Sequence, residues 1–393
     1  MEEKIKKLAQ KYLPEIIEIR EHLHKYPELA YEEEKTAQVV EKVLDKYNIP
    51  HTRLFNTGVV GIIEGKKPGK VVLLRGDMDA LPILEQTDIP YKSVVDNVMH
   101  ACGHDGHTAN LLGVGMILTE LKNEFFGTVK LMFQPAEETE GGARQMIDLG
   151  ILENPKVDAA FGLHLMGTLE EGKVEVKHGP MMGAPDEFTC RIIGRGGHAA
   201  SPEQCIDPIS VAVQFMNNAQ HILTRRLDPM KPALISFCRI HAGDGLNVIP
   251  NEIEFGGTIR TLYPEIRKQL PELLEKMLNH VCAANDATYE LNYHPSYPPL
   301  INDEAMTDLA QRAITKIVGI ENVSESPLAS LGAEDFAYLC EAVPSTFYYV
   351  GIRETGKPEP IHHHPEFAWR SECLEICMAT LSQVAIDFLS VDQ

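Results

Sequence analysis

Four strand-like apolar runs in this 393-residue chain each lead into polar side chains that can bind a metal ion or move a proton. Helical patterns such as "GHTANLLGVGMILTELKN" lie between the runs, and this alternation is typical of an α/β protein with mainly parallel strands. Functional sites in such proteins form beyond the carboxyl ends of the strands. The sequence therefore predicts that the polar residues meet at one edge of a sheet. The runs are "VVLLRG" (71–76) before Asp77 and Asp79, "TVKLMFQ" (128–134) before Glu137 and Glu138, "DAAFGLHL" (158–165) with His164, and "TFYYVG" (346–351) before a loop with "HHHP".

The middle of the chain has a different pattern. From about residue 183, strands and helices are expected in the order β-α-β-β-α-β, which is typical of a ferredoxin-like unit that can be inserted as a domain. The Pro-rich segment "YHPSYPPL" then predicts a hinge. We expect a discontinuous catalytic domain, residues 1–182 and 294–393, with a mainly parallel mixed sheet flanked by helices. Residues 183–293 would form the inserted α+β domain.

Composition limits the partners and the location. The formal net charge of −21 argues against nucleic acid or an anionic membrane surface as a partner, because both would repel the chain. The N-terminal segment has the pattern of an amphipathic helix, and no uninterrupted apolar stretch is long enough to cross a bilayer, so we expect a cytoplasmic protein. The eight cysteines are scattered without a C-x-x-C pair, and most are expected to be reduced core residues.

The stretch "MHACGHDGHTAN" (99–110) is the first candidate metal site. Cys102 and His104 are two residues apart, so they share a side only on an extended segment, and Gly103 and Gly106 favour a loop with a helix beginning near Gly106. A thiolate beside an imidazole suits a divalent ion such as Zn²⁺. The alternative is a polar turn in which Asp105 caps the following helix and the histidines are solvated. The other polar residues expected at the same sheet edge favour the metal site.

Two further groups contribute to this hypothesis. Adjacent glutamates after a strand, Glu137 and Glu138, can divide their roles, one binding a metal and the other handling the proton of the attacking water. In "HHHP", at most one or two of the three adjacent histidines could point inward.

Nine motifs follow one another along the chain: "RGDMDALP", "HACGHDGHTA", "FQPAEE", "GLH", "GRGGHAASP", "LNVIPNE", "GTIRT", "GAEDF" and "HHHPEF". Taken together, they resemble the motifs of the two-metal amidohydrolase and carboxypeptidase family, which includes aminoacylases, hippurate hydrolases and indoleacetyl-amino-acid hydrolases. The resemblance runs from the N-terminal helix to the last histidine motif. The set in this order is specific, although no single motif is.

The resemblance implies two divalent metal ions per subunit, Zn²⁺ first, with Mn²⁺, Co²⁺ or Ni²⁺ as alternatives. A cysteine would bridge the two ions. His104 and Glu138 would complete the shell of one ion, and His164 with a histidine of the C-terminal cluster that of the other. The implied ligands are Cys102, His104, Glu138, His164 and His363, with His362 and His364 as alternatives to His363.

The resemblance also implies roles for three acidic residues. Glu137 would be the general base that takes a proton from the attacking water and passes it to the leaving amine. Asp79 matches an aspartate that orients a ligand, a role that metal sites commonly need. Most of the family has His-x-Asp where this chain has Asp77-x-Asp79, so one metal-binding histidine is missing and His104 would replace it.

The inserted domain resembles the lid and dimerisation domain of the family, so we expect a homodimer or homotetramer formed through it. His198 would help to polarise the scissile carbonyl, acting in the same or the partner subunit, and Asn247 could donate to the same oxygen or to substrate. Arg260 would hold a substrate carboxylate. Without the resemblance, His198 would be an ordinary loop histidine and Arg260 a strand residue paired with a glutamate. The segment "GAEDF" (332–336) is expected to shape the pocket without a chemical step.

The function expected from the resemblance is metal-dependent hydrolysis of the amide bond of N-acyl amino acids or short peptides. A metallocarboxypeptidase or an N-acetyl-diaminopimelate deacetylase could use the same site. Two other classes stay open, a cysteine hydrolase with Cys102 as nucleophile and a non-catalytic protein that binds a metal or ligand.

Overall fold

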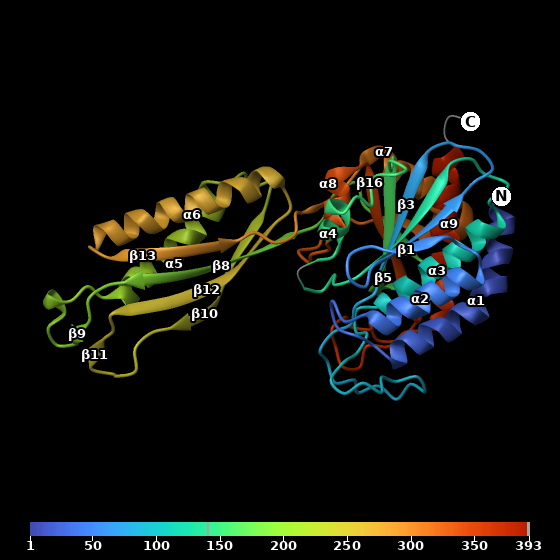
Figure 1. Ribbon diagram of the computed structural model, residues 1–393. Coiled ribbons are helices and arrows are strands. Elements are labelled where there is room, and N and C mark those ends of the chain that lie inside the picture. Colours follow the sequence, from blue (N-terminus) through green and yellow to red (C-terminus); the bar gives the residue numbers. More distant parts are fainter. Residues whose placement is uncertain (140, 391–393) are drawn as a thin grey trace. The chain divides into compact units, whose positions relative to one another are not determined.

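The computed structural model describes residues 1–139 and 141–390, and the chain folds into two compact units. Unit 1 comprises Met1–Gly179, Ile301–Pro327 and Asp335–Gln393, and unit 2 comprises Pro180–Leu300 and Leu328–Glu334. Figure 1 shows that the blue and red ends of the chain build unit 1 together. Within the described residues, each unit has its own cluster of buried apolar side chains.

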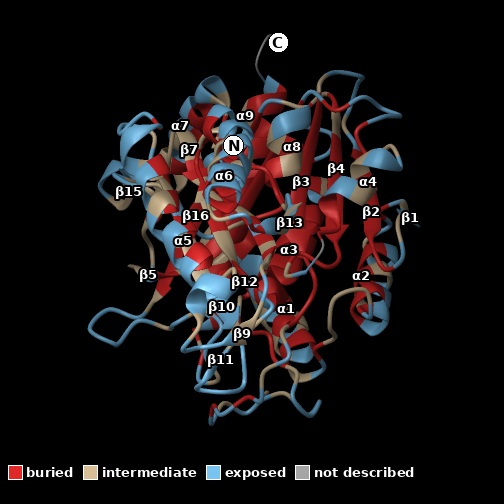
Figure 2. Cartoon of the chain, turned by 90° about the vertical axis from the view of Figure 1, so that its left-hand side faces the viewer, coloured by how far each residue is buried: buried red, intermediate tan, exposed pale blue. Residues whose placement is uncertain are grey.

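Unit 1 is built on a mixed sheet with the strand order β1-β2-β4-β3-β5-β16-β6-β15 (Figure 1). The neighbours β4, β3, β5 and β16 run parallel, so their carboxyl ends point to the same edge. These strands are buried on both faces, which explains their continuous apolar sequence runs; Figure 2 shows β3 and β4 in red. The strands are β1 (His51–Arg53), β2 (Val59–Glu64), β3 (Val71–Asp77), β4 (Thr128–Gln134), β5 (Ala159–Glu170), β6 (Val174–Val176), β15 (Val323–Glu325) and β16 (Ser345–Arg353).

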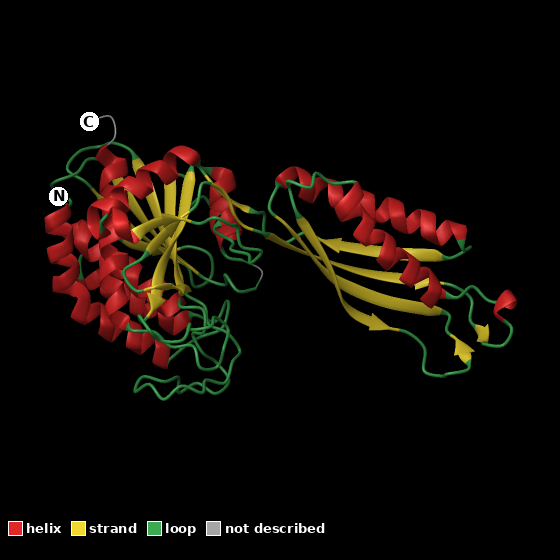
Figure 3. Ribbon diagram, turned by 180° about the vertical axis from the view of Figure 1, so that it is seen from behind, coloured by secondary structure: helices red, strands yellow, loops and turns green. Residues whose placement is uncertain are grey.

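Helices pack on this sheet (Figure 3). The central one is α3 (His104–Glu120), which contacts β3 as well as α1 (Glu2–Lys25) and α9 (Leu374–Ser390), and it is buried from His104 to Leu118. Helix α1 is amphipathic, and its buried face recurs every three or four residues. The buried positions of α1 are Ile5, Ala9, Tyr12, Ile16, Arg20, Leu23 and His24. The other helices are α2 (Glu34–Lys46), α4 (Ala143–Asp148), α7 (Glu304–Val318), α8 (Ala337–Ala342), η2 (Ile320–Asn322) and η3 (Ser371–Cys373).

One helical segment of the described residues, Ser371–Ser390, is long and apolar enough to cross a membrane by length and composition alone. Three acidic residues, Glu372, Glu375 and Asp387, interrupt it. In the folded protein, 78% of its most apolar window is buried, because α9 packs against α1, α3 and α7. This burial is typical of a core helix.

Unit 2 is built on an antiparallel sheet with the order β10-β12-β8-β13, on which α5 and α6 pack (Figure 1). Its core includes Phe188, Phe215, Phe255, Leu270 and Leu278. The order of strands and helices confirms the ferredoxin-like pattern predicted from the sequence. The elements are β8 (Ala184–Ile193), α5 (Pro208–Arg225), β10 (Ala233–His241), β12 (Glu252–Thr261), α6 (Pro264–Ala284) and β13 (Thr288–His294).

Unit 2 is larger than the inserted segment expected from the sequence, residues 183–293. It includes Leu328–Glu334, which is tied to the start of β8 by a hydrogen bond of 2.8 Å from Gly183 N to Gly332 O.

The remaining described elements are short. Strand β7 (Gly179–Met182) pairs with β14 (Leu300–Asn302), β9 (Gly197–His198) pairs with β11 (Val248–Ile249), and the 3-10 helix η1 spans Pro202–Gln204.

Candidate active site

The polar residues expected at one sheet edge all belong to unit 1. Gly103 has a φ of 98°, so the chain turns there into α3, which begins at His104 rather than near Gly106. Cys102 therefore precedes the helix and His104 starts it. The other candidates lie in or after the parallel strands: Asp79 after β3, Glu137 and Glu138 after β4, His164 in the middle of β5, and His363 in the loop between β16 and η3.

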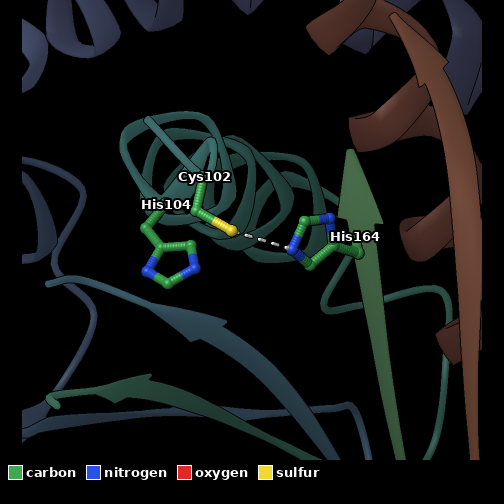
Figure 4. A group of neighbouring side chains, drawn as sticks. All are labelled: Cys102, His104 and His164. Carbon is green, nitrogen blue, oxygen red and sulfur yellow. Dashed lines mark hydrogen bonds between the residues drawn. The ribbon is translucent and has the colours of Figure 1, made fainter. Parts of the chain in front are cut away.

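Cys102, His104 and His164 form the first group of candidate metal ligands (Figure 4). One ligand atom from each residue lies within 4.8 Å of the others, and Cys102 Sγ is 3.5 Å from His164 Nε2. Figure 4 shows the cysteine sulfur between the two imidazole rings; His164 comes from β5, His104 from the start of α3 and Cys102 from the segment before it.

Cys102, Glu138 and His363 form a second group with the same separation limit of 4.8 Å. Nε2 of His363 lies 3.2 Å from Glu138 Oε1. The backbone of His363 has a φ of 61°, and its N–H donates to Ala101 O at 2.8 Å, which ties the histidine loop to the segment before α3. Cys102 thus belongs to both groups.

These groups differ from the ligand pairing that the resemblance implied. His104 falls with His164, and Glu138 with His363, around the shared Cys102. His104 also lies in a group with Glu137 and Glu138, so the pairing implied by the resemblance, His104 with Glu138 and His164 with a C-terminal histidine, stays a prediction.

The neighbours of His363 have other partners. His362 Nε2 lies 2.9 Å from Leu165 O, and burial lowers the pKa of His362 to about 4. His364 is exposed, and its Nδ1 accepts a hydrogen bond of 3.2 Å from Glu366 N. Of the three adjacent histidines, His363 therefore has the geometry of a ligand.

Hydrogen bonds fix the tautomers of His104 and His164. Nδ1 of His164 lies 2.7 Å from Leu165 O, and Nδ1 of His104 lies 3.0 Å from Asp79 O and 3.2 Å from Asp79 Oδ1. Carbonyl and carboxylate oxygens only accept, so each Nδ1 carries the proton and each Nε2 keeps its lone pair for the cluster.

The cluster fits divalent metal ions. Nε2 of His104 is buried and has no hydrogen-bond partner among the described residues; it lies 3.8 Å from Glu138 Oε1 and 4.0 Å from Glu137 Oε2. A buried acceptor left unpaired is costly, and a cation between these atoms would satisfy it. The mixture of sulfur, nitrogen and carboxylate oxygen donors suits a borderline ion such as Zn²⁺.

Charge in the cluster also favours a cation. Burial, with a further contribution from Glu138, raises the pKa of the Cys102 thiol well above its ordinary value. A divalent ion bound to the sulfur opposes both effects, because a coordinating thiol loses its proton. Without such an ion, the buried thiol is a poor nucleophile.

Asp79 connects two parts of the cluster. One carboxylate oxygen faces His104 Nδ1, and the other accepts a hydrogen bond of 2.9 Å from Glu138 N. Glu137 is 7% exposed and lies in a group with His104 and Glu138. Asp79 is thus placed to orient a histidine and the turn that carries both glutamates.

Asp77 and His107 are structural neighbours of the cluster. His107 Nδ1 lies 2.7 Å from Asp77 Oδ1, and His107 Nε2 accepts from Leu165 N at 3.0 Å, so both ring nitrogens are occupied. Burial alone would raise the pKa of Asp77, but Arg75, whose Nη1 donates to Asp77 Oδ2 at 2.6 Å, holds it well below the ordinary value. Asp77 therefore pairs with an arginine within the protein.

Reasoning from the sequence assigned no role to Arg75 and no chemical step to Asp335 of the "GAEDF" segment. In the structure the buried guanidinium of Arg75 also donates to Asp335 Oδ1 at 2.8 Å and to Gln134 Oε1 at 2.8 Å. Asp335 further accepts from Ala143 N at 3.0 Å. This network joins the ends of β3 and β4 to the segment before α8. The available signal was a polar residue near the carboxyl end of each strand, Arg75 in β3 and Gln134 in β4.

The prediction that Asp105 caps α3 was wrong. The N-cap residue is Gly103, and Asp105 lies in the first turn, fully buried, where it accepts from Arg20 Nε at 2.7 Å and pairs with His24 Nδ1 at 2.9 Å. The first turn is thereby anchored to α1. His100 is buried, neither of its ring nitrogens forms a hydrogen bond within the part of the chain that the structure describes, and burial lowers its pKa to about 3.

Three of the residues singled out from the sequence lie on unit 2. His198 is exposed in β9, and its Nδ1 accepts from Ala200 N at 3.0 Å. Asn247 is exposed, and its carbonyl accepts from Ala199 N at 3.1 Å. Arg260 is half-buried in β12, and within the described residues its side chain has no hydrogen bond or ion pair. The glutamate partner that would have made Arg260 a purely structural residue is thus absent from the described part of the chain.

Comparison with known proteins agrees with this geometry. The model of peptidase family M20/M25/M40 matches residues 73–387. The N-acyl-L-amino acid amidohydrolase of Geobacillus stearothermophilus is 42% identical over 302 residues, 76% of this chain and 81% of the relative. The N-acetylcysteine deacetylase of Bacillus subtilis is 36% identical over 375 residues, 94% of this chain and 96% of the relative.

A solved structure matches nearly the full length of the chain. The YXEP protein of Bacillus subtilis, described as a dinuclear metal binding peptidase from the M20 family, has a TM-score of 0.84 and 34% identity and covers 97% of this chain and 99% of its own. The resemblance stated from the sequence motifs is therefore confirmed. The chain belongs to peptidase family M20/M25/M40.

Proposed function

We propose that the protein hydrolyses the amide bond of N-acyl amino acids, releasing a carboxylic acid and a free amino acid. The observation that carries this proposal is the shared position of Cys102 in two groups of ligand atoms. Relatives named N-acyl-L-amino acid amidohydrolase and N-acetylcysteine deacetylase support the substrate class. Relatives named thermostable carboxypeptidase keep short peptides as a second candidate class.

The two groups would hold two divalent ions, Zn²⁺ first, with Mn²⁺, Co²⁺ or Ni²⁺ as alternatives. His104 and His164 would bind one ion, and Glu138 and His363 the other, with Cys102 between them. When bound, the ions would supply a Lewis acid for the scissile carbonyl and lower the pKa of the attacking water. Asp79 keeps His104 in the tautomer that presents Nε2.

Glu137 would move the proton. It is nearly buried beside the ligand cluster, and its Oε2 lies 4.0 Å from His104 Nε2. It would take a proton from the water that attacks the carbonyl carbon and give it to the nitrogen of the leaving amine as the C–N bond breaks. A carboxylate serves both steps because it returns to its starting state after each turnover.

Unit 2 would act as the lid and dimerisation domain, with unit 1 as the catalytic domain. His198 would stabilise the negative charge on the carbonyl oxygen in the same or the partner subunit, with Asn247 donating to that oxygen or to substrate. Arg260, which has no partner in the described residues, would pair with the carboxylate of the substrate. The assembly would be a homodimer or homotetramer, and the location the cytoplasm.

The test is a panel of acetyl, benzoyl and indoleacetyl amino acids and dipeptides, assayed for release of free amine before and after chelation. We expect activity to disappear with the chelator and to return with Zn²⁺, Mn²⁺ or Co²⁺. Activity that survives chelation would indicate a cysteine hydrolase. A wild-type protein that binds metal but hydrolyses no member of the panel would indicate a binding protein.

Metal counting separates the roles of the residues. Glu137→Gln should keep two ions per chain and lose activity by about 100-fold or more, the usual effect of removing a general base. Glu138→Gln should lose bound metal as well as activity, although the two substitutions are chemically identical. An undiminished metal count and full activity in Cys102→Ser would overturn the bridging role of the cysteine.

A further inference from the structure

The residue before Glu137 has an unusual backbone conformation. Ala136, between the end of β4 and the two glutamates, has a φ of 58°, in the left-handed region. Residues other than glycine are disfavoured in this region because their Cβ atom crowds the backbone. Such a conformation persists only when the surrounding structure holds it. The direction in which Glu137 leaves the strand therefore depends on what holds Ala136.

A buried carboxylate holds this turn. Ala136 N donates to Glu33 Oε1 at 2.9 Å, and Thr57 Oγ1 donates to Glu33 Oε2 at 2.6 Å. Glu33 is fully buried, and Thr57 is 2% exposed. On the other side of Glu137, Glu138 N donates to Asp79 Oδ2 at 2.9 Å. Glu137 thus lies between two amides, each fixed by a separate buried carboxylate.

The side chain of Glu33 does not cap the helix that follows it, α2. Glu33 is the N-cap residue of α2, yet its side chain makes no capping hydrogen bond. Glu28 provides the hydrogen-bond acceptor for the free N–H groups of the first turn of α2 instead. Its carboxylate accepts from Thr36 N at 2.8 Å and from Lys35 N at 3.2 Å. Burial of the Glu33 carboxylate is therefore explained by its contacts with Ala136 and Thr57.

The same segment also reaches the turn after β3. Glu28 O accepts from Ala80 N at 2.8 Å, next to Asp79. Residues 28–33 thus contact the two loops that carry Asp79 and Glu137, and do so through backbone amides. Main-chain contacts of this kind set the course of a loop without touching its reactive side chains.

We propose that Glu33 is a positioning residue for the general base: it holds the left-handed turn at Ala136 and so sets the direction of Glu137. This inference rests on the role of Glu137 in the proposed function. Glu33 contacts the Ala136 amide and Thr57, so its effect on catalysis passes through the backbone. It should influence the proton transfer step and leave metal binding by Cys102, His104 and His164 intact.

The test is a double-mutant cycle in the metal-loaded enzyme. Glu33→Ala should lower kcat by about 10- to 100-fold, the effect expected when a catalytic group is displaced by up to about 1 Å. KM and metal content should change little. Glu33→Gln should keep most of the activity, because the amide oxygen still accepts from Ala136 N. Ala136→Gly in the Glu33→Ala background should restore most of the lost kcat, because glycine adopts a positive φ without support.

A general loss of packing would not be rescued by a glycine at position 136, so the rescue separates positioning from a structural role. Glu34→Ala is the matched control; this exposed neighbour pairs with Arg53, and its removal should leave kcat unchanged. An unchanged kcat in Glu33→Ala would overturn the proposal. So would a loss of kcat that Ala136→Gly fails to restore.

If Glu33→Ala does not fold, Ala136→Val tests the same idea with Glu33 intact. A β-branched residue resists a positive φ, so kcat should fall while the metal count stays the same. A fully active Ala136→Val enzyme would overturn the proposal. Glu137→Gln, measured in parallel, distinguishes the two hypotheses. If Glu137→Gln is active, the proposed role of Glu137 as general base is wrong. If Glu137→Gln is inactive and Glu33→Ala is fully active, only the positioning role of Glu33 is contradicted.

Discussion

Arg20 forms the most deeply buried ion pair near the metal cluster. Its side chain is fully buried in α1, Nε donates to Asp105 Oδ2 at 2.7 Å, and the guanidinium lies 4.2 Å from the centre of the Trp369 ring. Removing one partner of a buried pair costs about 3–5 kcal/mol, and without Arg20 the buried Asp105 carboxylate keeps, among the described residues, only its contact with His24 Nδ1. We expect Arg20→Met, which keeps the side-chain length, to lower the free energy of unfolding by about that amount. Denaturant unfolding of the metal-free protein measures it.

The matched control for this prediction is Arg53. Its ion pairs with Glu34 and Glu41 lie at the surface, and its side chain is 28% exposed. Water and salt screen such pairs, so Arg53→Met should cost at most about 1 kcal/mol. Equal losses in the two variants would contradict the assigned importance of burial.

His24 should make stability depend on pH. Burial alone would lower its pKa, but hydrogen bonds with Asp105 at 2.9 Å and Glu85 at 3.3 Å outweigh burial and leave the pKa raised. Folding therefore favours the protonated form. The stabilisation is complete below the ordinary histidine pKa of about 6.5 and is lost as the pH rises through the raised folded-state pKa.

His24→Asn removes this contribution. The difference in free energy of unfolding between wild type and His24→Asn should therefore be larger at about pH 6 than at about pH 9. Both proteins are measured without metal, so that the candidate ligand histidines titrate alike in each. A difference that stays constant or grows with pH would show that His24 is not charged in the folded state.

Candidate ligands that lie in short motifs could be picked out from the sequence, but the residues that hold them in place could not. Cys102 and His104 carry their signal in spacing and composition. Asp105 looks like a helix cap because its actual partner, Arg20, lies 85 positions away in the chain. The buried stripe of α1 gave one unused clue, since its spacing of three or four residues continues through Ile16 to Arg20 and marks a charged residue as buried.

At the scale of elements, the start of α3 depends on close packing at Gly106. A Cβ there would lie 2.6 Å from Leu165 Cδ1 and 2.6 Å from Trp369 Cζ2. Alanine favours helix over glycine by about 1 kcal/mol, whereas overpacking a core costs about 1–3 kcal/mol. We expect Gly106→Ala to be destabilising overall and to weaken metal binding by about tenfold or more, because it displaces the turn that carries His104. Competition with a chromogenic chelator measures the affinity.

A second substitution tests the cause. Trp369→Phe removes the ring atoms nearest to the added methyl group, so Gly106→Ala with Trp369→Phe should recover part of the affinity lost in Gly106→Ala. If Gly106→Ala binds metal as tightly as the wild type, the first turn of α3 is not held by this contact.

The same glycine explains why the helix start was misplaced. In the sequence, Gly103 and Gly106 both favour a loop. In the structure Gly103 makes the turn, whereas Gly106 is helical and is small because Leu165 and Trp369 occupy the space of a side chain. The parallel strands were easier to predict, since burial on both faces leaves a continuous apolar run in the sequence.

At the scale of the whole molecule, the two apolar cores contain different residues, and unit 1 carries the five ligands named in the proposed function: Cys102, His104, Glu138, His164 and His363. The order of elements predicted the ferredoxin-like fold of unit 2, because each of its elements is contiguous in sequence. The sequence could not predict that Leu328–Glu334 belongs to unit 2. Backbone hydrogen bonds such as Gly183 N to Gly332 O tie this segment to unit 2, and backbone contacts leave no pattern in the side chains.

Separate cores predict separate responses to heat. A ligand that binds only the folded state stabilises it by about 4 kcal/mol when its concentration is 1,000 times its dissociation constant. Scanning calorimetry should therefore show two transitions, of which only the one from unit 1 moves to lower temperature when a chelator removes the metal. Phe255→Ala supplies the matched control, because Phe255 is fully buried in the core of unit 2 and its loss should cost about 3–5 kcal/mol there. The variant should shift the other transition while the chelator-sensitive one stays in place. A single transition that moves under both treatments would mean that the two cores unfold together and that the metal stabilises the molecule as a whole.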